Sequence, residues 1–187
     1  MSKTIFDIET SGLDQRRSNI LQFAYMEIGD DLSPIRQGSI YLKPYTSDWT
    51  AGAEAVHKLS KPFLMEHGVD PEYGAANIWA LLYYRDILTY NGKTFDLPLV
   101  NNYCQAVGTS DVYVRDHYDL CLELPKIYGG KRRKLVDAVQ EFGIKASAIE
   151  RLTSILFGEP NHLNPHDARY DVVATYMLYK KVMQRVQ

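Results

Sequence analysis

The sequence lacks the features that mark membrane-spanning, secreted and disulfide-stabilised proteins. No apolar run is long enough to cross a bilayer, and the N-terminus does not show the basic and then apolar order of a signal peptide. Only two cysteines are present, Cys104 and Cys121, and they form neither a Cys-x-x-Cys metal motif nor a disulfide framework. We therefore expect a cytoplasmic protein in a reducing environment, with no membrane partner.

The sequence also has little net charge and no internal repeat or low-complexity tract. The formal net charge is −2 at pH 7, so the chain lacks the overall basic charge that indicates nucleic-acid binding. A role with nucleic acid would have to depend on local patches or on bound metal ions. The length of 187 residues and the hydrophobic content of 45% indicate one globular domain over residues 1–187.

Strand patterns dominate the first part of the chain. Residues 4–10, 20–28 and 35–42 are predicted strands, and the short links between them are typical of an antiparallel meander. Residues 44–59 are predicted to form a loop, because Pro44, Ser47-Asp48 and Gly52 are turn-forming residues.

Helices and strands alternate in the rest of the chain. Apolar spacing and helix-end signals predict helices over residues 60–68, 71–84, 96–108, 134–143, 147–157 and 166–182. Short strands are predicted at residues 86–90 and within residues 112–120. A meander followed by alternating helices and strands predicts an α/β fold, in which helices pack on a mixed sheet.

Two acidic residues lie side by side in the first strand. Side chains alternate along a strand, so Asp7 and Glu9 share one face while Phe6 and Ile8 lie on the other, where they can be buried. Neighbouring carboxylates repel each other, and a hard divalent cation between them would stabilise the pair. The alternative is a strand end that carries two solvated acids.

Two more acids and a histidine occur at helix starts. Asp96 begins the helix after Asn91, either as a metal ligand or as an N-terminal cap. Asp171 borders the apolar face of the last helix, where a carboxylate without a partner is costly. His166 can approach Asp171 if it lies in the turn that Pro165 allows, and the alternative is a solvent-exposed histidine at the helix start.

Three segments resemble the motifs of the DnaQ-like 3′–5′ exonucleases in their DEDDh variant. Residues 7–13 (Asp-Ile-Glu-Thr-Ser-Gly-Leu) are similar to the first motif, residues 91–96 to the second, and His166-x-Ala168-x-x-Asp171 to the third. Val56-His57 and residues 134–144 are similar to two lesser segments of that family. The resemblance covers nearly the whole chain in the expected order. It implies a ribonuclease H-like fold, a five-stranded mixed sheet with an antiparallel meander and parallel strands, flanked by helices.

The resemblance also implies a site and an activity. Asp7, Glu9, Asp96 and Asp171 would bind two divalent ions, Mg²⁺ or Mn²⁺, about 3.5–4 Å apart. His166 would be the general base. The implied reaction is hydrolysis of the terminal phosphodiester at the 3′ end of single-stranded or frayed nucleic acid, which releases nucleoside 5′-monophosphates. DNA is the favoured substrate and RNA the alternative.

Further residues are candidates for contacts with the substrate. Thr10, Leu13, His57 and Asn91 are predicted to bind the substrate, although each could instead serve its local turn or the core. A basic run at residues 131–134 either binds phosphate or is a solvated loop.

Two other functions remain open from the sequence. The chain could be a non-catalytic nucleic-acid-binding or scaffold domain of the same fold, or a metal-dependent phosphohydrolase that acts on small nucleotides. A polymerase partner and self-association are also left open.

Overall fold

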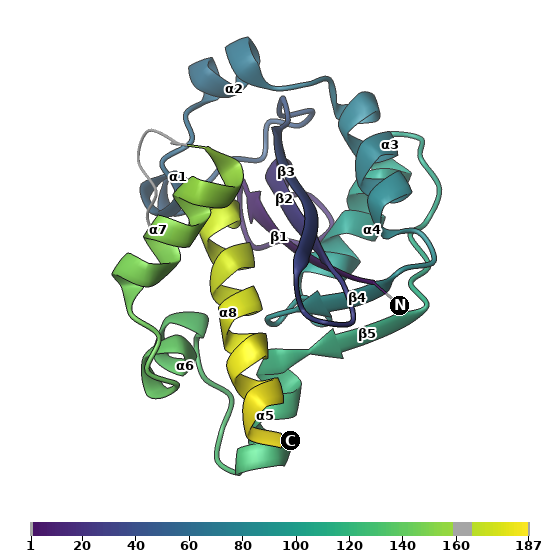
Figure 1. Cartoon of the computed structure of the whole chain (residues 1–187). Coiled ribbons are helices and arrows are strands. Elements are labelled where there is room, and N and C mark those ends of the chain that lie inside the picture. The colour runs from purple at the N-terminus through teal and green to yellow at the C-terminus, as the bar shows by residue number, and fades with distance from the viewer. Residues whose placement is uncertain (1, 159–165, 187) are drawn as a thin grey trace.

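The protein contains one five-stranded mixed sheet with helices on both faces (Figure 1). The computed structural model describes residues 2–158 and 166–186. In the sheet order β3-β2-β1-β4-β5, strands β1, β2 and β3 pair antiparallel, whereas β4 lies parallel to β1 and β5 parallel to β4. The predicted meander and mixed sheet are confirmed. The strands are β1 (Lys3–Thr10), β2 (Ile20–Ile28), β3 (Pro34–Tyr41), β4 (Asp86–Thr89) and β5 (Asp116–Asp119).

Eight helices are found in the described part of the chain, and six of them cover the two faces of the sheet in separate groups. Residues of α3 and α4 pack in one core, and residues of α5, α6, α7 and α8 pack in the other. The helices are α1 (Ala51–His57), α2 (Lys61–His67), α3 (Pro71–Leu82), α4 (Asp96–Ala106), α5 (Leu120–Tyr128), α6 (Leu135–Glu141), α7 (Ala146–Phe157) and α8 (Ala168–Val186).

The central strand β1 contributes to both cores. Phe6 and Ile8 pack in the core with α3 and α4, as the alternation predicts, and Ile5 packs in the core with α8. Because side chains alternate along a strand, Asp7 and Glu9 lie on the same face as Ile5. The two acids therefore lie on the face that α8 covers.

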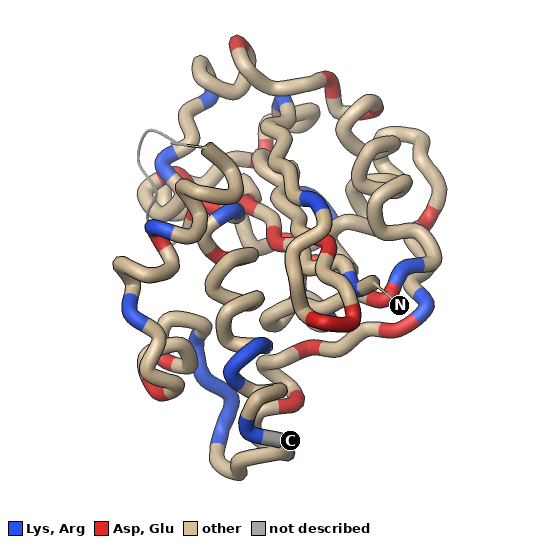
Figure 2. The backbone as a smooth tube through the Cα atoms, in the orientation of Figure 1, with Lys and Arg blue, Asp and Glu red and all other residues tan. Residues whose placement is uncertain are grey.

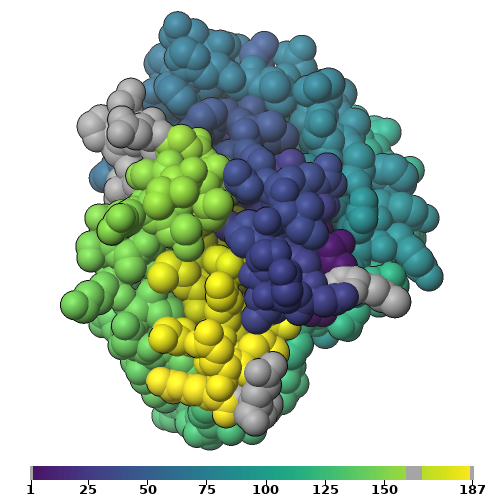
Figure 3. Space-filling model, in the orientation of Figure 1, coloured from purple at the N-terminus to yellow at the C-terminus, as the bar shows by residue number. Residues whose placement is uncertain are grey.

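Helix α8 is held between its neighbours. In the space-filling view its surface lies between α7 and the β2–β3 hairpin (Figure 3). The hydroxyl of Tyr176 donates a hydrogen bond of 2.9 Å to the carbonyl of Leu32 in the turn of that hairpin. These contacts fix the helix whose first turn carries Asp171.

The prediction of a loop over residues 44–59 is wrong in its second half, which contains α1. Thr50 caps this helix by accepting a 3.2 Å hydrogen bond from the backbone N–H of Ala53. Lys58 ends it in the left-handed region with φ 62°. Gly52 lies inside the helix, so its presence did not indicate a turn.

Helix α5 is not predicted by the sequence, which indicates a strand within residues 112–120 and no element directly after it. The strand β5 ends at Asp119, and the helix starts at the next residue. The Asp119 carboxylate accepts a 3.0 Å hydrogen bond from the backbone N–H of Cys121 and so caps α5. Pro125 inside the helix masks its helical character in the sequence.

Both cysteines, Cys104 and Cys121, are buried and free in the structure. Among the residues that the structure describes, no helix has the length and apolar character needed to span a membrane.

Candidate metal centre

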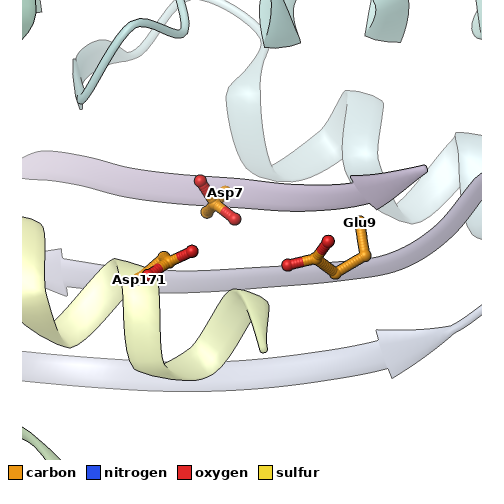
Figure 4. Close-up of side chains that lie close together, drawn as sticks. All are labelled: Asp7, Glu9 and Asp171. Carbon is orange, nitrogen blue, oxygen red and sulfur yellow. The ribbon is translucent and has the colours of Figure 1, made fainter. Parts of the chain in front are cut away.

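Three carboxylates from opposite ends of the chain meet on one face of the sheet. Oxygen atoms of Asp7, Glu9 and Asp171 all lie within 4.8 Å of one another. Figure 4 shows the side chains of the two β1 acids and of Asp171 turned toward the space between β1 and the first turn of α8. Glu9 is buried, while Asp7 and Asp171 are half-buried. Strand alternation and a helix start thus bring the predicted acids together.

Asp96 is a fourth acid beside this cluster. It is the first residue of α4, and Phe95 occupies the cap position, so Asp96 is not the N-terminal cap of the helix. Burial is the main factor that raises the pKa of Asp96 to about 7, with further contributions from Asp119 and Asp171. Hydrogen bonds from the backbone N–H groups of Asp96 itself and Ile8 oppose this rise.

The other three acids have raised pKa values for related reasons. Burial, followed by the charges of the neighbouring carboxylates, raises the pKa of Asp7 and of Glu9 well above the usual range. Burial and the nearby charge of Asp167 raise the pKa of Asp171 to about 7, against the backbone N–H of His166, which lowers it. Ionisation of all four acids together is therefore unfavourable without a compensating cation.

The four acids border a cleft of about 730 Å³. Two other predicted residues, Asn91 and His166, also line this cleft. Carboxylate oxygens are the ligands that Mg²⁺ and Mn²⁺ prefer, and their mutual repulsion favours a bound cation. The donor set, the raised pKa values and the access through the cleft therefore fit a site for divalent metal ions.

His166 lies in the turn before α8, as expected if it approaches Asp171. Its side chain is exposed, its φ is 75°, and it lines the cleft. Its backbone N–H donates to the Asp171 carboxylate. The positive φ marks a constrained backbone for a residue other than glycine, and such positions are often found at functional sites.

The four residues predicted to bind the substrate lie in different surroundings. Asn91 lines the cleft, and its side-chain oxygen also accepts a 2.8 Å hydrogen bond from the Thr94 hydroxyl. Thr10, Leu13 and His57 are not among the residues that line the cleft. Their contact roles remain predictions, and of the four only Asn91 lines the cleft.

Thr10, Leu13 and His57 differ in their local surroundings. The Thr10 hydroxyl donates a 2.7 Å hydrogen bond to the Gly12 carbonyl, and the Leu13 side chain is 84% exposed. His57 is buried, and its Nδ1 accepts a 3.0 Å hydrogen bond from the backbone N–H of Leu59.

A buried carboxylate that the sequence does not predict, that of Asp119, organises the second motif. Asp119 is 1% exposed, and its two oxygens accept hydrogen bonds of 2.8 Å from the Asn91 N–H and 2.9 Å from the Lys93 N–H. It accepts a third from Cys121 at the start of α5. Asp119 therefore fixes the loop that leads from β4 to Asp96. The sequence signal was an acid directly before an apolar helix start, which also fits a simple cap.

Replacement of Asp119 with asparagine is expected to destabilise the protein by about 2 kcal/mol. An amide has only one acceptor oxygen, so its NH₂ group would face a backbone N–H donor. Urea unfolding followed by circular dichroism measures the change. Asp116→Asn is the matched control, because Asp116 lies in the same strand with an exposed side chain. Equal stability of the two variants would show that Asp119 does not fix the loop.

A second missed residue anchors the start of α8. The side chain of Gln22, buried in β2, accepts a 3.2 Å hydrogen bond from the Ala168 N–H and donates one of 3.1 Å to Asp167. Asp167 also pairs with the Arg169 guanidinium. Gln22 lies opposite Glu9 in the β1–β2 register, so one strand pair positions both Glu9 and the helix that carries Asp171. A glutamine in a mainly apolar strand was the only sequence signal.

Comparison with known proteins gives the family. A family model described as RNase_H_2 of the RNase H superfamily matches residues 4–155. The chain belongs to the RNase H superfamily. This confirms the ribonuclease H-like fold that the motifs implied.

Solved structures of E. coli exonuclease I share the fold. The zinc-bound form of its complex with single-stranded DNA has a TM-score of 0.74 at 24% identity, and covers 98% of this chain and 40% of that one. The complex with a dA16 oligonucleotide has a TM-score of 0.74 at 23% identity, with 98% and 41% covered. The complex with a 5cy-dT13 oligonucleotide has a TM-score of 0.78 at 21% identity, with 98% and 40% covered.

These matches cover only part of the exonuclease I chains. The chain spans about two fifths of the length of these exonuclease I chains, and at this identity the likeness concerns the fold. A search of curated proteins found no match.

Proposed function

We propose that the protein is a metal-dependent 3′–5′ exonuclease of the DnaQ-like DEDDh type. It hydrolyses the terminal phosphodiester of single-stranded or frayed nucleic acid, preferably DNA, and releases nucleoside 5′-monophosphates. The observation that carries the proposal is the convergence of Asp7, Glu9 and Asp171 within 4.8 Å, beside a cleft that Asp96 and His166 also line. These are the five residues that the motif resemblance assigned to catalysis.

Each of these residues has a defined task in the proposed reaction. Asp7, Glu9, Asp96 and Asp171 would hold two divalent ions, Mg²⁺ or Mn²⁺. When bound, such ions supply positive charge that lowers the pKa of water and stabilises the leaving 3′ oxygen. His166 accepts the proton of the attacking water, since an imidazole can take up and release a proton near neutral pH. Its exposed position on the cleft wall gives it access to solvent.

The preference for a single strand follows from access to the acids. Glu9 and Asp96 are buried, so the terminal nucleotide must leave a duplex to bring its phosphodiester to them. Complexes of exonuclease I with dA16 and dT13 oligonucleotides are known for the same fold, which supports single-stranded DNA as the substrate here.

Digestion of matched DNA and RNA oligonucleotides labelled at the 5′ end tests the proposal. With Mg²⁺ we expect a ladder of labelled products that shortens stepwise, because removal from the 3′ end leaves the label on the remaining strand. EDTA should stop the reaction, and single-stranded DNA should be shortened faster than RNA. Early release of a labelled mononucleotide would contradict the direction, and intact oligonucleotides with folded protein would favour a scaffold role.

A further inference from the structure

A basic segment lies on the wall of the same cleft as the acids. Lys131, Arg132, Arg133 and Lys134, here called the basic rim, connect α5 to α6, and Figure 2 shows them as a continuous basic stretch of the backbone. All of them except Lys131 line the cleft. Acidic and basic side chains are thus separated along one cleft, although the net charge of the whole chain is only −2.

Local contacts hold the basic rim against the second motif. Gly129 and Gly130, at φ 76° and 89°, adopt left-handed backbone that other residues rarely take, and they turn the chain after α5. The Tyr90 hydroxyl then donates a 2.7 Å hydrogen bond to the Arg133 carbonyl. Tyr90 directly precedes Asn91, so the rim is tied to the segment that leads to Asp96.

The basic side chains of the rim differ in whether they form an ion pair. Arg133 is engaged in an ion pair, with its Nε 3.0 Å from Oε2 of Glu141. Arg132 and Lys134 have exposed side chains, and neither forms an ion pair with any residue in the described ranges 2–158 and 166–186. Two cationic side chains on the cleft wall are therefore available to an anion from solution.

We propose that Arg132 and Lys134 bind backbone phosphates of the strand whose 3′ end reaches the acidic cluster. This inference rests on the proposed function. Every nucleotide carries a phosphate, so a strand with its last phosphodiester at the acids must bring further phosphates along the cleft. An acidic cluster alone repels them, and cations on the adjoining wall offset that repulsion. Contacts to phosphate do not read bases, so they hold strands of any sequence.

Binding of a labelled oligonucleotide tests the inference. Fluorescence anisotropy is recorded in EDTA with a 5′-fluorescein oligothymidylate of about 12 nucleotides, a length within the range that single-strand binding sites cover. All proteins carry Asp7→Asn, so that the probe is not consumed. The variant adds Arg132→Gln and Lys134→Gln. The control adds Lys145→Gln and Lys181→Gln, which remove the same charge from exposed residues outside the cleft.

The expected result is a loss specific to the rim. Two lost phosphate contacts should weaken binding about tenfold near 0.1 M salt and reduce the slope of log K against log salt by about 1.4, at roughly 0.7 per contact. The control pair should change both quantities little. An unchanged affinity and slope in the rim variant, or an equal loss in both pairs, would overturn the inference.

Digestion by the unmodified chain separates this inference from the proposed activity. If Mg²⁺-dependent digestion occurs while the rim variant binds normally, the activity stands and the rim is not a phosphate site. If the rim is needed for binding but the unmodified chain digests nothing, the binding site stands and the proposed activity is wrong.

Discussion

Replacement of Asp7 with asparagine is expected to slow oligonucleotide hydrolysis at least about a thousandfold, equivalent to about 4 kcal/mol of transition-state stabilisation. The charges of Asp96, Asp171 and Glu9 all raise the pKa of Asp7, so its carboxylate is electrostatically linked to each of the other three acids. Asparagine keeps the shape of the side chain but loses the charge that holds metal ions. The measurement is the initial rate at which a full-length 5′-labelled strand disappears at saturating Mg²⁺.

Asp116→Asn is the control for this experiment, because Asp116 is exposed and does not line the cleft. It should keep the rate of the unmodified chain. Both variants should show the same circular dichroism spectrum as the unmodified chain. A folded Asp7→Asn protein that hydrolyses the strand within tenfold of the unmodified rate would contradict a catalytic role for the cluster.

The metal-free protein is expected to lose stability as the pH rises from about 4 to about 7. The pKa of Asp96 is about 7 in the folded chain, against an ordinary value of 3.8. Across this window the folded state therefore holds a proton that the unfolded state releases, so stability falls with pH. Below the window both states are protonated, and above it the loss is complete. For Asp96 alone it is about 4 kcal/mol at 1.36 kcal/mol per pKa unit, as an upper value.

Thermal unfolding in EDTA between pH 4.5 and 8 measures this loss. Asp96→Asn should be more stable than the unmodified chain at pH 8, and the difference should shrink toward pH 4.5, because asparagine carries no charge at either pH. Addition of Mg²⁺ or Mn²⁺ should raise the melting temperature of the unmodified chain more at pH 8 than at pH 4.5. A melting temperature that rises with pH in EDTA, with no effect of the metals, would show that ionisation of the acidic cluster does not destabilise the protein.

The sequence predicted the fold well wherever local patterns decide the structure. The alternation of β1 placed Phe6 and Ile8 in one core and the two acids on the opposite face, because side-chain direction in a strand follows from its period of two. The meander followed from short links between strands. The helix starts at Lys61 and Pro71 followed from a serine cap and from prolines near the first turn.

The errors arose where a helix is too short to show a period, or where a contact joins residues that are distant in the sequence. Short helix α1 is set by its cap at Thr50 and by its left-handed end at Lys58, and a seven-residue helix has little periodicity to detect. Asp119 and Gln22 act through backbone groups brought to them by the fold, so neither spacing nor residue type reveals the contact. Leu13 and His57 do not line the cleft, and their positions in the sequence do not reveal this.

A titration with Mn²⁺, followed by electron paramagnetic resonance of the free ion, tests most directly whether the acids of three distant segments form one metal centre. We predict that the unmodified chain binds about two Mn²⁺ ions at pH 8. Asp7→Asn and Asp171→Asn should each bind fewer ions or bind them more weakly, while Asp116→Asn should match the unmodified chain. Equal Mn²⁺ binding by all four proteins, or no binding by the unmodified chain, would contradict a shared metal centre.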